Sequence, residues 1–295
     1  MAALAPLWPV ALETIDVAAG GSDALTIVAS ASAPVRSLAI ALGAGARFDL
    51  RILNAGVPYG RIALTVTLGE GADFTLGAAQ LGRGAETLEI VTTVHHAAPD
   101  ATSRQVIRSV LAGHATGTYL GKVAVARGAD GTDAGQSVRA MLLDRTATAN
   151  AKPELEIYAD DVKCAHGCAV GELDAAALFY MASRGIPPAE AKRLMLQAFI
   201  AEAFVGAADE DALTAAALAR LGELVCAGSN FLPSRMREGP GVGPLQRCAP
   251  RKAPPLTPRA CGRGTWPSIS PACATPMAAA GTTSTPPPPR RSRKW

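Results

Sequence analysis

Short apolar segments follow one another along the first half of the chain. Hydrophobic and polar residues alternate within most of them, and turn residues such as Gly43, Gly69 and Gly128 separate one segment from the next. Period-2 alternation in short segments between turn residues is typical of β-strands, so the pattern predicts a mainly β domain. The predicted strands lie at residues 25–28, 38–42, 48–53, 62–68, 74–76, 88–94, 106–111, 119–125, 138–143 and 155–158.

Three β architectures fit such a series of strands: a sandwich, a barrel and a parallel β-helix. Two-residue hairpin turns are nearly missing, with Asp130-Gly131 as the one example. No long helical segments separate the strands, as βαβ crossovers would require. Strands joined by irregular corners and stacked about 4.8 Å apart suit a β-helix better. Because no strict hexapeptide or nonapeptide repeat is present, periodicity alone leaves the sandwich open.

The pattern changes to a helical period after Gly171. Three helices are predicted over residues 172–184, 189–205 and 209–225, and Gly185 and Gly206 end the first two. The second helix carries an apolar stripe at Leu194, Met195, Ala198 and Phe199. The third carries one at Leu213, Ala217, Leu221 and Leu224. Three short amphipathic helices cannot bury every apolar face among themselves, so a docking surface for a partner is an alternative to a core role.

Composition divides the chain into a β core at residues 1–171, a helical region at 172–228 and a tail at 229–295. The tail holds 14 of the 22 prolines and has no apolar periodicity, so it is predicted to be disordered. The shift falls inside what should be the end of the last helix. We therefore interpret the tail as an out-of-frame translation of GC-rich sequence. Resequencing tests this hypothesis, and an intact frame with the same tail in close relatives would contradict it.

The net charge of +3 hides two parts of opposite sign. Residues 1–228 carry 17 Lys and Arg against 24 Asp and Glu, whereas residues 229–295 carry 11 against 1. The predicted folded part is therefore acidic, which argues against nucleic acid as a partner. No segment is long and apolar enough to span a membrane, and the N-terminal apolar stretch lacks the basic residues of a signal peptide. We expect a soluble, cytoplasmic protein with reduced cysteines.

Candidate metal or cluster ligands lie between the last predicted strand and the first predicted helix. Cys164, His166 and Cys168 are spaced by two residues, so on an extended strand their side chains would project from one face. Thiolates and imidazole bind zinc, iron and iron–sulfur clusters. Three ligands leave a tetrahedral site incomplete, so a fourth would come from elsewhere or from a partner chain. The alternative is that the cysteines are small buried residues and the histidine makes a structural hydrogen bond.

Other motifs in the chain give less support for a functional site. His95 and His96 are adjacent, so on a strand one would face inward and the other solvent. Gly121-Lys122 resembles the end of a phosphate-binding loop, but Val123 stands where Ser or Thr must reach magnesium, so no nucleotide site is predicted. The paired carboxylates at residues 160–161 are interpreted as solvated charges at a strand end. With no Gly-x-Ser-x-Gly motif either, we predict that the chain is not an enzyme.

Several segments of the chain resemble the SufB/SufD family of iron–sulfur cluster assembly proteins, and its SufD branch in particular. The most specific segment is KPELEIYADDVKCAHG at residues 152–167. Further matching segments lie at residues 95–99, 110–113, 121–122, 132–134, 170–174, 178–180, 183–187 and 198–202. The resemblance is specific over residues 86–206 and weak before them.

The resemblance implies a right-handed parallel β-helix with C-terminal helices, which decides between the architectures left open above. It also implies a scaffold subunit that pairs with a SufB-like protein through the β-helix and binds the ATPase SufC through helices at residues 172–205. An iron–sulfur cluster would be bound transiently and shared with the partner, and SufC would supply nucleotide hydrolysis. By similarity, His166 and then Cys164 would contact the cluster. Cys168 stands where the family has a small residue, so its role is doubtful.

Two alternatives come from other classes of protein. A stand-alone metal-binding β-helix protein would combine Cys164, His166 and Cys168 in one site and would hold stoichiometric zinc or iron when purified alone. A homodimeric structural module would not co-purify with a SufB-like protein and an ABC-type ATPase.

Overall fold

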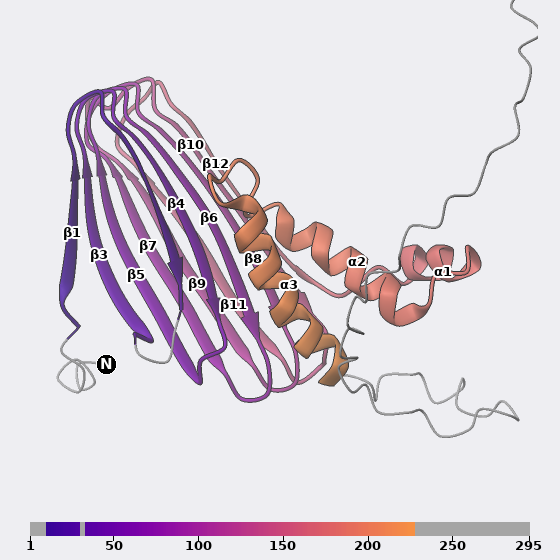
Figure 1. Ribbon diagram of the computed structural model, residues 1–295. Helices are drawn as coiled ribbons and strands as arrows, with labels where there is room; N and C mark the ends of the chain where they lie inside the picture. The colour runs from indigo at the N-terminus through magenta and orange to yellow at the C-terminus, as the bar shows by residue number, and fades with distance from the viewer. Residues whose placement is uncertain (1–9, 30–32, 228–295) are drawn as a thin grey trace, which may run out of the picture. The chain divides into compact units, whose positions relative to one another are not determined.

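The computed structural model describes residues 10–29 and 33–227; the predicted tail at 229–295 lies outside them. The described residues form twelve β-strands followed by three α-helices (Figure 1). The strands are β1 (Leu12–Val17), β2 (Ser22–Val28), β3 (Val35–Leu42), β4 (Arg47–Ala55), β5 (Tyr59–Leu68), β6 (Asp73–Gly82), β7 (Thr87–His96), β8 (Thr102–Leu111), β9 (Thr116–Val125), β10 (Asp133–Leu142), β11 (Thr148–Ile157) and β12 (Lys163–Gly171). The helices are α1 (Ala175–Ser183), α2 (Pro188–Ala201) and α3 (Glu210–Ala227).

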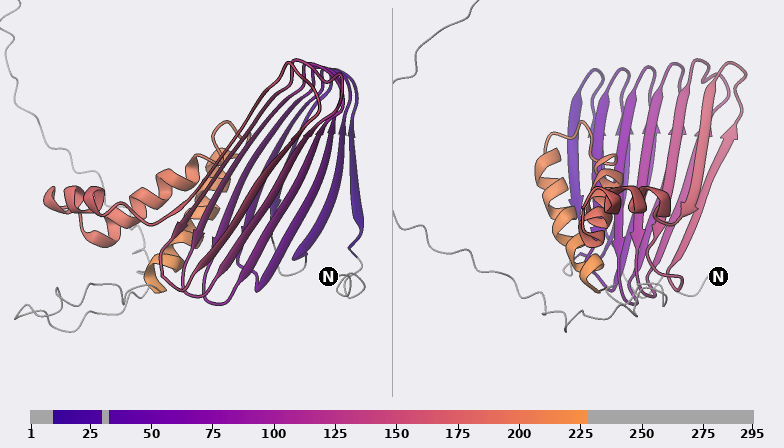
Figure 2. Two further views of the ribbon diagram at one scale, coloured as in Figure 1. Left: turned by 180° about the vertical axis from the view of Figure 1, so that it is seen from behind. Right: turned by 90° about the vertical axis from the view of Figure 1, so that its right-hand side faces the viewer.

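The strands alternate between two parallel sheets. Odd-numbered strands form one sheet in the order β1-β3-β5-β7-β9-β11, and even-numbered strands form the other in the order β12-β10-β8-β6-β4-β2. A chain that moves back and forth between two parallel sheets winds into stacked coils, which are visible from the side in Figure 2. The predicted parallel β-helix is therefore confirmed, and the sandwich that periodicity had left open is excluded.

The register explains why no strict repeat is visible in the sequence. Arg47 pairs with Asp73 and Asp73 with Thr102, so successive coils are 26 and 29 residues long. Ten of the strands coincide with the predicted apolar segments, and β1 and β12 are additional. Both additional strands lie at sheet edges, where exposure weakens the alternation that marks a strand.

The corners between odd and even strands stack on one another. Gly20, Gly45 and Gly71 occupy equivalent corner positions with φ of 68°, 65° and 61°, and Asp100 follows in the next corner with φ of 59°. This left-handed region excludes most residues that carry a Cβ, although aspartate tolerates it. The N–H of Asp100 donates to the carbonyl of Asp130 in the following corner at 2.9 Å. The turn residues of the sequence therefore mark the ends of the coils.

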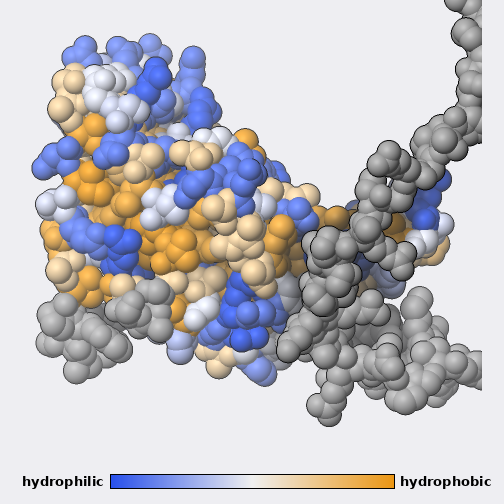
Figure 3. All heavy atoms as spheres, viewed as in Figure 1, coloured by the Kyte–Doolittle hydropathy of each residue, from blue (hydrophilic) through white to orange (hydrophobic). Residues whose placement is uncertain are grey.

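The inward-facing side chains of both sheets form a continuous apolar core. Phe48, Leu50, Phe74, Leu76 and Val66 are each at most 2% exposed within it. Burying apolar surface in this way is the main driving force for folding. On the face seen in Figure 3, hydrophilic residues gather at the corners and hydrophobic residues midway along the strands.

A second apolar cluster joins the helices to the outer face of the even-numbered sheet. α3 buries all four residues of its predicted stripe against outward residues of this sheet such as Leu81 and Val110. The predicted face of α3 is therefore confirmed. The packing leaves the inner core and the helical layer as two separate clusters that share the same strands.

The predicted stripe of α2 is confirmed only in part, because Phe199 packs against this cluster while two other stripe residues are exposed. Its buried residues are Ala191, Leu196 and Ile200, whereas Leu194 is 37% exposed and Ala198 is exposed. Apolar residues extend around more than half of this helix, so its own pattern does not say which side meets the sheet. The position of the sheet decides that, and part of the predicted stripe is left on the surface.

Close backbone packing and a partly buried ion pair join the α2 end to the β-helix. A Cβ added to Gly77 would lie 1.8 Å from the carbonyl oxygen of Ala203, so only glycine fits there. The Arg108 side chain is fully buried, and its guanidinium contacts the Glu202 carboxylate at 2.8 and 2.9 Å. The same guanidinium lies 5.8 Å from the Phe199 ring centroid.

Candidate functional site

β12 carries the three candidate ligands and is the last strand of its sheet. Among residues 10–29 and 33–227, it pairs with β10 on one side only, and β11 likewise ends the other sheet. The C-terminal end of the β-helix is therefore open and offers two unpaired strand edges. Such edges pair readily with strands of another chain.

All three candidate ligands face the interior of this open end. Cys164 pairs in register with Ala134, and His166 and Cys168 follow at the same spacing. Ala134 belongs to the inner core, against which Cys164 also packs. Since side chains alternate along a strand, residues 166 and 168 share the inward face of residue 164. The extended arrangement predicted from the spacing is thus present.

The three side chains differ in exposure. Cys164 is half-buried, whereas His166 and Cys168 are exposed at the uncovered end. Burial raises the pKa of the Cys164 thiol, and the charge of Asp133 adds to this effect, although a backbone hydrogen bond from Ala134 opposes it. The Cys164 thiol therefore stays protonated to higher pH than an ordinary cysteine. A thiol must lose its proton to become a metal ligand.

Within the described part of the chain, no three His, Cys, Asp or Glu side chains are grouped so that they could hold a metal ion. The structure places Cys164, His166 and Cys168 on one face but strung along the strand. Chemically, this offers one imidazole and up to two thiols in a row toward the open end. Any further ligand at this position would have to approach through that opening.

A buried polar network behind the site was not foreseen from the sequence. The hydroxyls of Thr92 and Tyr119 lie 3.2 and 3.1 Å from Oε1 of Gln105. Gln136 pairs in register with Gln105 on one side and with His166 on the other. One feature of the sequence could have predicted it. Gln105 in β8 and Gln136 in β10 each occupy a position where the alternation places an apolar, inward-facing residue.

The remaining sequence candidates have structural roles. His96 is fully buried with its Nε2 2.9 Å from Ser103 Oγ, while His95 faces outward on the same strand. This confirms the expectation for the adjacent pair. Burial lowers the pKa of His96 to about 4, so it is neutral at physiological pH. Lys122 pairs with Glu156 at 2.6 Å on the outer face of β9 and β11.

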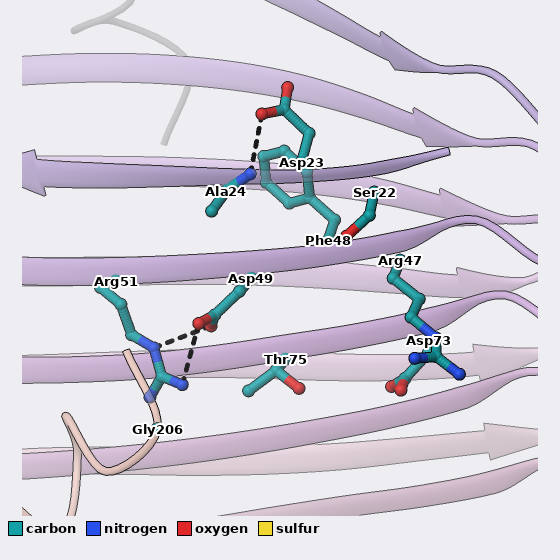
Figure 4. Close-up of a pocket in the computed structure, with 10 residues that line it drawn as sticks. All are labelled: Ser22, Asp23, Ala24, Arg47, Phe48, Asp49, Arg51, Asp73, Thr75 and Gly206. Carbon is teal, nitrogen blue, oxygen red and sulfur yellow. Dashed lines mark hydrogen bonds and ion pairs between the residues drawn. The ribbon is translucent and has the colours of Figure 1, made fainter. Parts of the chain in front are cut away.

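Two surface hollows offer alternative sites on the described part of the chain. One, of about 380 Å³, crosses the outer face of the last strands beside His166, where Gly135 and Gly167 leave space. The other, of about 550 Å³, lies over the first even-numbered strands (Figure 4). There Arg51 is already engaged by Asp49 at 2.7 Å and by the carbonyl of Ala203. Arg51 therefore helps to dock the turn after α2.

The first two helices expose a separate apolar surface. α1 contains no buried residue and projects away from the strands in Figures 1 and 2. Phe179 is 76% exposed and Tyr180 58% exposed, and Leu194 of α2 is 37% exposed. Aromatic side chains of this size are seldom left in water without a purpose. We call Phe179, Tyr180 and Leu194 the helical apolar surface.

None of the helices that the structure describes is long and apolar enough to cross a membrane.

Comparison with known proteins agrees with the geometry. A family model described as "SUF system FeS cluster assembly, SufBD core domain" matches residues 25–199, more than half of the chain. The matched segment includes every strand from β3 to β12 as well as α1 and most of α2.

Curated relatives match part of the chain. The chain is 35% identical to the iron–sulfur cluster assembly protein SufD of Escherichia coli over 144 residues, which are 49% of this chain and 34% of that protein. It is 33% identical to a SufBD family protein of Synechocystis over 171 residues, 57% of this chain and 37% of the relative. It is 33% identical to SufD of Bacillus subtilis over 121 residues, 41% and 28%. The matched segments thus span about a third of the relatives' lengths. The chain belongs to the SufB/SufD family of SUF iron–sulfur cluster assembly proteins, on its SufD branch.

Proposed function

We propose that this chain is a non-enzymatic scaffold subunit for iron–sulfur cluster assembly in the cytoplasm, with His166 and Cys164 at a site shared with a second subunit. The observation that carries the proposal is the open end of the β-helix. There β11 and β12 each have one unpaired edge among the described residues, and β12 carries the inward-facing imidazole and thiol. Membership in the family supplies the cargo class.

The partner at this end would be a SufB-like subunit. Its edge strand would pair with β11 or β12 and bring its own ligands to the site beside His166 and Cys164. A cluster is then the cargo of the assembled pair rather than a resident cofactor of this chain. An incomplete ligand set on one chain is what such a shared site requires, because a cluster ordinarily takes four protein ligands.

The helical apolar surface supports a second contact, with a SufC-like ATPase. Phe179 and Tyr180 offer aromatic anchors, and aromatic residues dominate the binding energy of many interfaces. This surface and the open end lie on different elements, so the two partners would contact different residues. The ATPase would supply the nucleotide hydrolysis for which this chain shows no motif.

Anaerobic cluster reconstitution with both partners tests the role of His166. His166→Ala should form markedly less cluster than the wild type, while Cys168→Ala, a matched change two residues along the same face, should form nearly as much. Both variants should still co-purify with the SufB-like subunit. Unchanged cluster formation in His166→Ala would remove this residue from the mechanism.

Purification of the chain alone separates the proposal from its alternatives. Stoichiometric, tightly bound zinc or iron in the isolated chain would favour a stand-alone metal protein. Capture of a second copy in place of a SufB-like subunit would favour a homodimeric module. For the ATPase contact, Phe179→Asp should abolish co-purification with the SufC-like protein, and the control Leu12→Asp, an exposed apolar residue on β1, should not.

A further inference from the structure

A column of inward-facing positions changes its chemistry along the β-helix. The residues in register are Leu50, Leu76, Gln105, Gln136 and finally His166. The two leucines belong to the apolar core, whereas the next two positions carry amides and the last an imidazole. Parallel strands lie about 4.8 Å apart, so in-register side chains stack at that spacing. The polar part of the column therefore leads directly to the candidate site.

Three amide atoms in this column lack a hydrogen-bond partner among residues 10–29 and 33–227. They are Nε2 of Gln105 and both Nε2 and Oε1 of Gln136. The two glutamines are only 1% and 3% exposed. Buried amides left unpaired are strongly unfavourable and rare in native proteins, so partners for these atoms are expected.

Gln80 shows that this fold can pair a buried glutamine completely. Its Nε2 donates to the carbonyls of Leu88 and Thr118, both at 3.1 Å, and its Oε1 accepts from the Ser109 hydroxyl at 2.9 Å. Gln80 is 1% exposed, like Gln105. Gln105 and Gln136 therefore differ from Gln80, although Oδ1 of the buried Asn54 is unpaired as well.

We propose that Gln105, Gln136 and His166 form a hydrogen-bonded ladder that orients the His166 ring. A rotation of the two amide side chains would let Nε2 of Gln105 donate to Oε1 of Gln136, and Nε2 of Gln136 donate to the ring nitrogen of His166 that faces it. Only this direction pairs all three amide atoms, because the reverse direction leaves Nε2 of Gln105 without an acceptor. In-register glutamines on parallel strands form such ladders in stacked β-structures.

The ladder determines which ring nitrogen of His166 carries the proton. A neutral imidazole has one N–H and one acceptor nitrogen. If the inner nitrogen accepts from Gln136, the N–H points to the open end of the β-helix. An N–H there suits an anionic acceptor, such as a thiolate of a partner strand or sulfide of the cargo, so in this tautomer His166 contacts the cargo as a hydrogen-bond donor and not as an iron ligand. Gln136 is then a positioning residue, and only the identity of the acceptor rests on the proposed function.

The tautomer of His166 can be read directly by NMR. The full chain is labelled with ¹⁵N-histidine and examined at a pH of about 9, where an ordinary imidazole is neutral. Wild type should show one His166 tautomer, with the proton on the outward nitrogen. Gln136→Met should give a mixture of both. Gln136→Glu should reverse the tautomer, because a carboxylate can only accept.

Two further comparisons control the result. Val138→Ala alters the in-register neighbour of Cys168, two residues along the same strand, and should leave the His166 tautomer unchanged. In urea unfolding, Gln136→Met should lower the midpoint if the ladder exists. A raised midpoint would mean that the amide is unpaired in the folded state and would overturn the proposal. A tautomer mixture in wild type would overturn it as well.

Neither measurement involves a cluster or a partner. Failure of the ladder would therefore leave the assembly function standing, and unchanged reconstitution by His166→Ala would leave the ladder standing.

Discussion

The N-terminal and C-terminal coils of the β-helix share one backbone plan but hold different interiors. In the first coils, Leu50 and Leu76 fill the column that Gln105, Gln136 and His166 occupy in the last. The leucines are completely buried, while His166 is exposed. Strand pairing is parallel throughout, so the backbone does not account for the change.

The difference shows how one fold supports both stability and function. Apolar side chains in the first coils gain free energy simply by leaving water. Polar side chains in the last coils gain little unless each finds a hydrogen-bond partner, either within the proposed ladder or beyond the open end. The following predictions test whether the two halves differ in this way.

The largest effect is expected from a cavity in the apolar half. Leu76→Ala should lower the free energy of unfolding by about 4 kcal/mol, because rigid neighbouring coils prevent the cavity from collapsing. Leu155→Ala, at an inward position of the edge strand β11, should cost only about 1 kcal/mol, because Leu155 is only partly buried. Urea denaturation of both variants provides the comparison. Equal losses would show that the two halves are packed alike.

Acid should lower the free energy of unfolding through His96, at the end of β7 between the first and the last coils. Burial lowers the pKa of His96 to about 4 in the folded state, against 6.5 for an ordinary histidine. The unfolded chain therefore binds more protons between these values, and stability present above about pH 6.5 is lost as the pH falls toward 4. The loss amounts to about 3 kcal/mol.

Unfolding of His96→Gln at several pH values isolates this contribution. The variant keeps a donor to Ser103 but cannot take up a proton, so its stability should fall less than that of the wild type between pH 7 and 4. His95→Gln, which alters the outward neighbour, should follow the wild type. Parallel curves for wild type and His96→Gln would contradict the prediction.

A smaller effect should follow from adding one methyl group to the outer face of the even-numbered sheet. In Gly77→Ala the new Cβ would meet the carbonyl of Ala203, so the end of α2 must move, at a cost of about 2 kcal/mol. Gly135→Ala adds the same group where nothing lies within 4 Å, and should change stability by less than about 0.5 kcal/mol. Thermal unfolding measures both, and equal shifts would argue against close docking of the helices at Gly77.

The smallest effect concerns the two thiols at the open end. Cys168 is exposed, whereas Cys164 is half-buried and its pKa is raised. Alkylation by iodoacetamide should therefore be several-fold faster at Cys168, because the reacting species is the thiolate. Mass spectrometry of peptides from partly alkylated chain gives the ratio. A SufB-like partner should slow both reactions if it covers this end, and an unchanged rate would place the partner elsewhere.

Much of the fold could be predicted from local patterns in the sequence. Ten strands, the three helices and the buried face of α3 follow from apolar spacing, because each element must bury one side. The edge strands β1 and β12 were missed since exposure removes the alternation. The buried face of α2 was predicted only in part. Several faces of this helix are apolar, and only the position of the sheet decides which one is buried.

The candidate site could be predicted from the sequence in part. The spacing of Cys164, His166 and Cys168 predicted one shared face, and the adjacent histidines were correctly assigned to opposite sides of their strand. The roles proposed for His166 and Cys164 stay predictions. The glutamines behind His166 escaped notice because Gln105 and Gln136 are 31 residues apart in the chain and meet only through strand register.

The sequence by itself determined the local chemistry of this protein: which segments become strands, where glycine allows the chain to turn, and which residues can act as ligands. Only the tertiary structure decided which residues share a level of the β-helix, because coils of unequal length conceal the register. It also decided that the strand bearing His166 ends the stack. Whether a side chain is a buried core residue or lies at an open edge depends on its neighbours in space, which spacing along the chain does not specify.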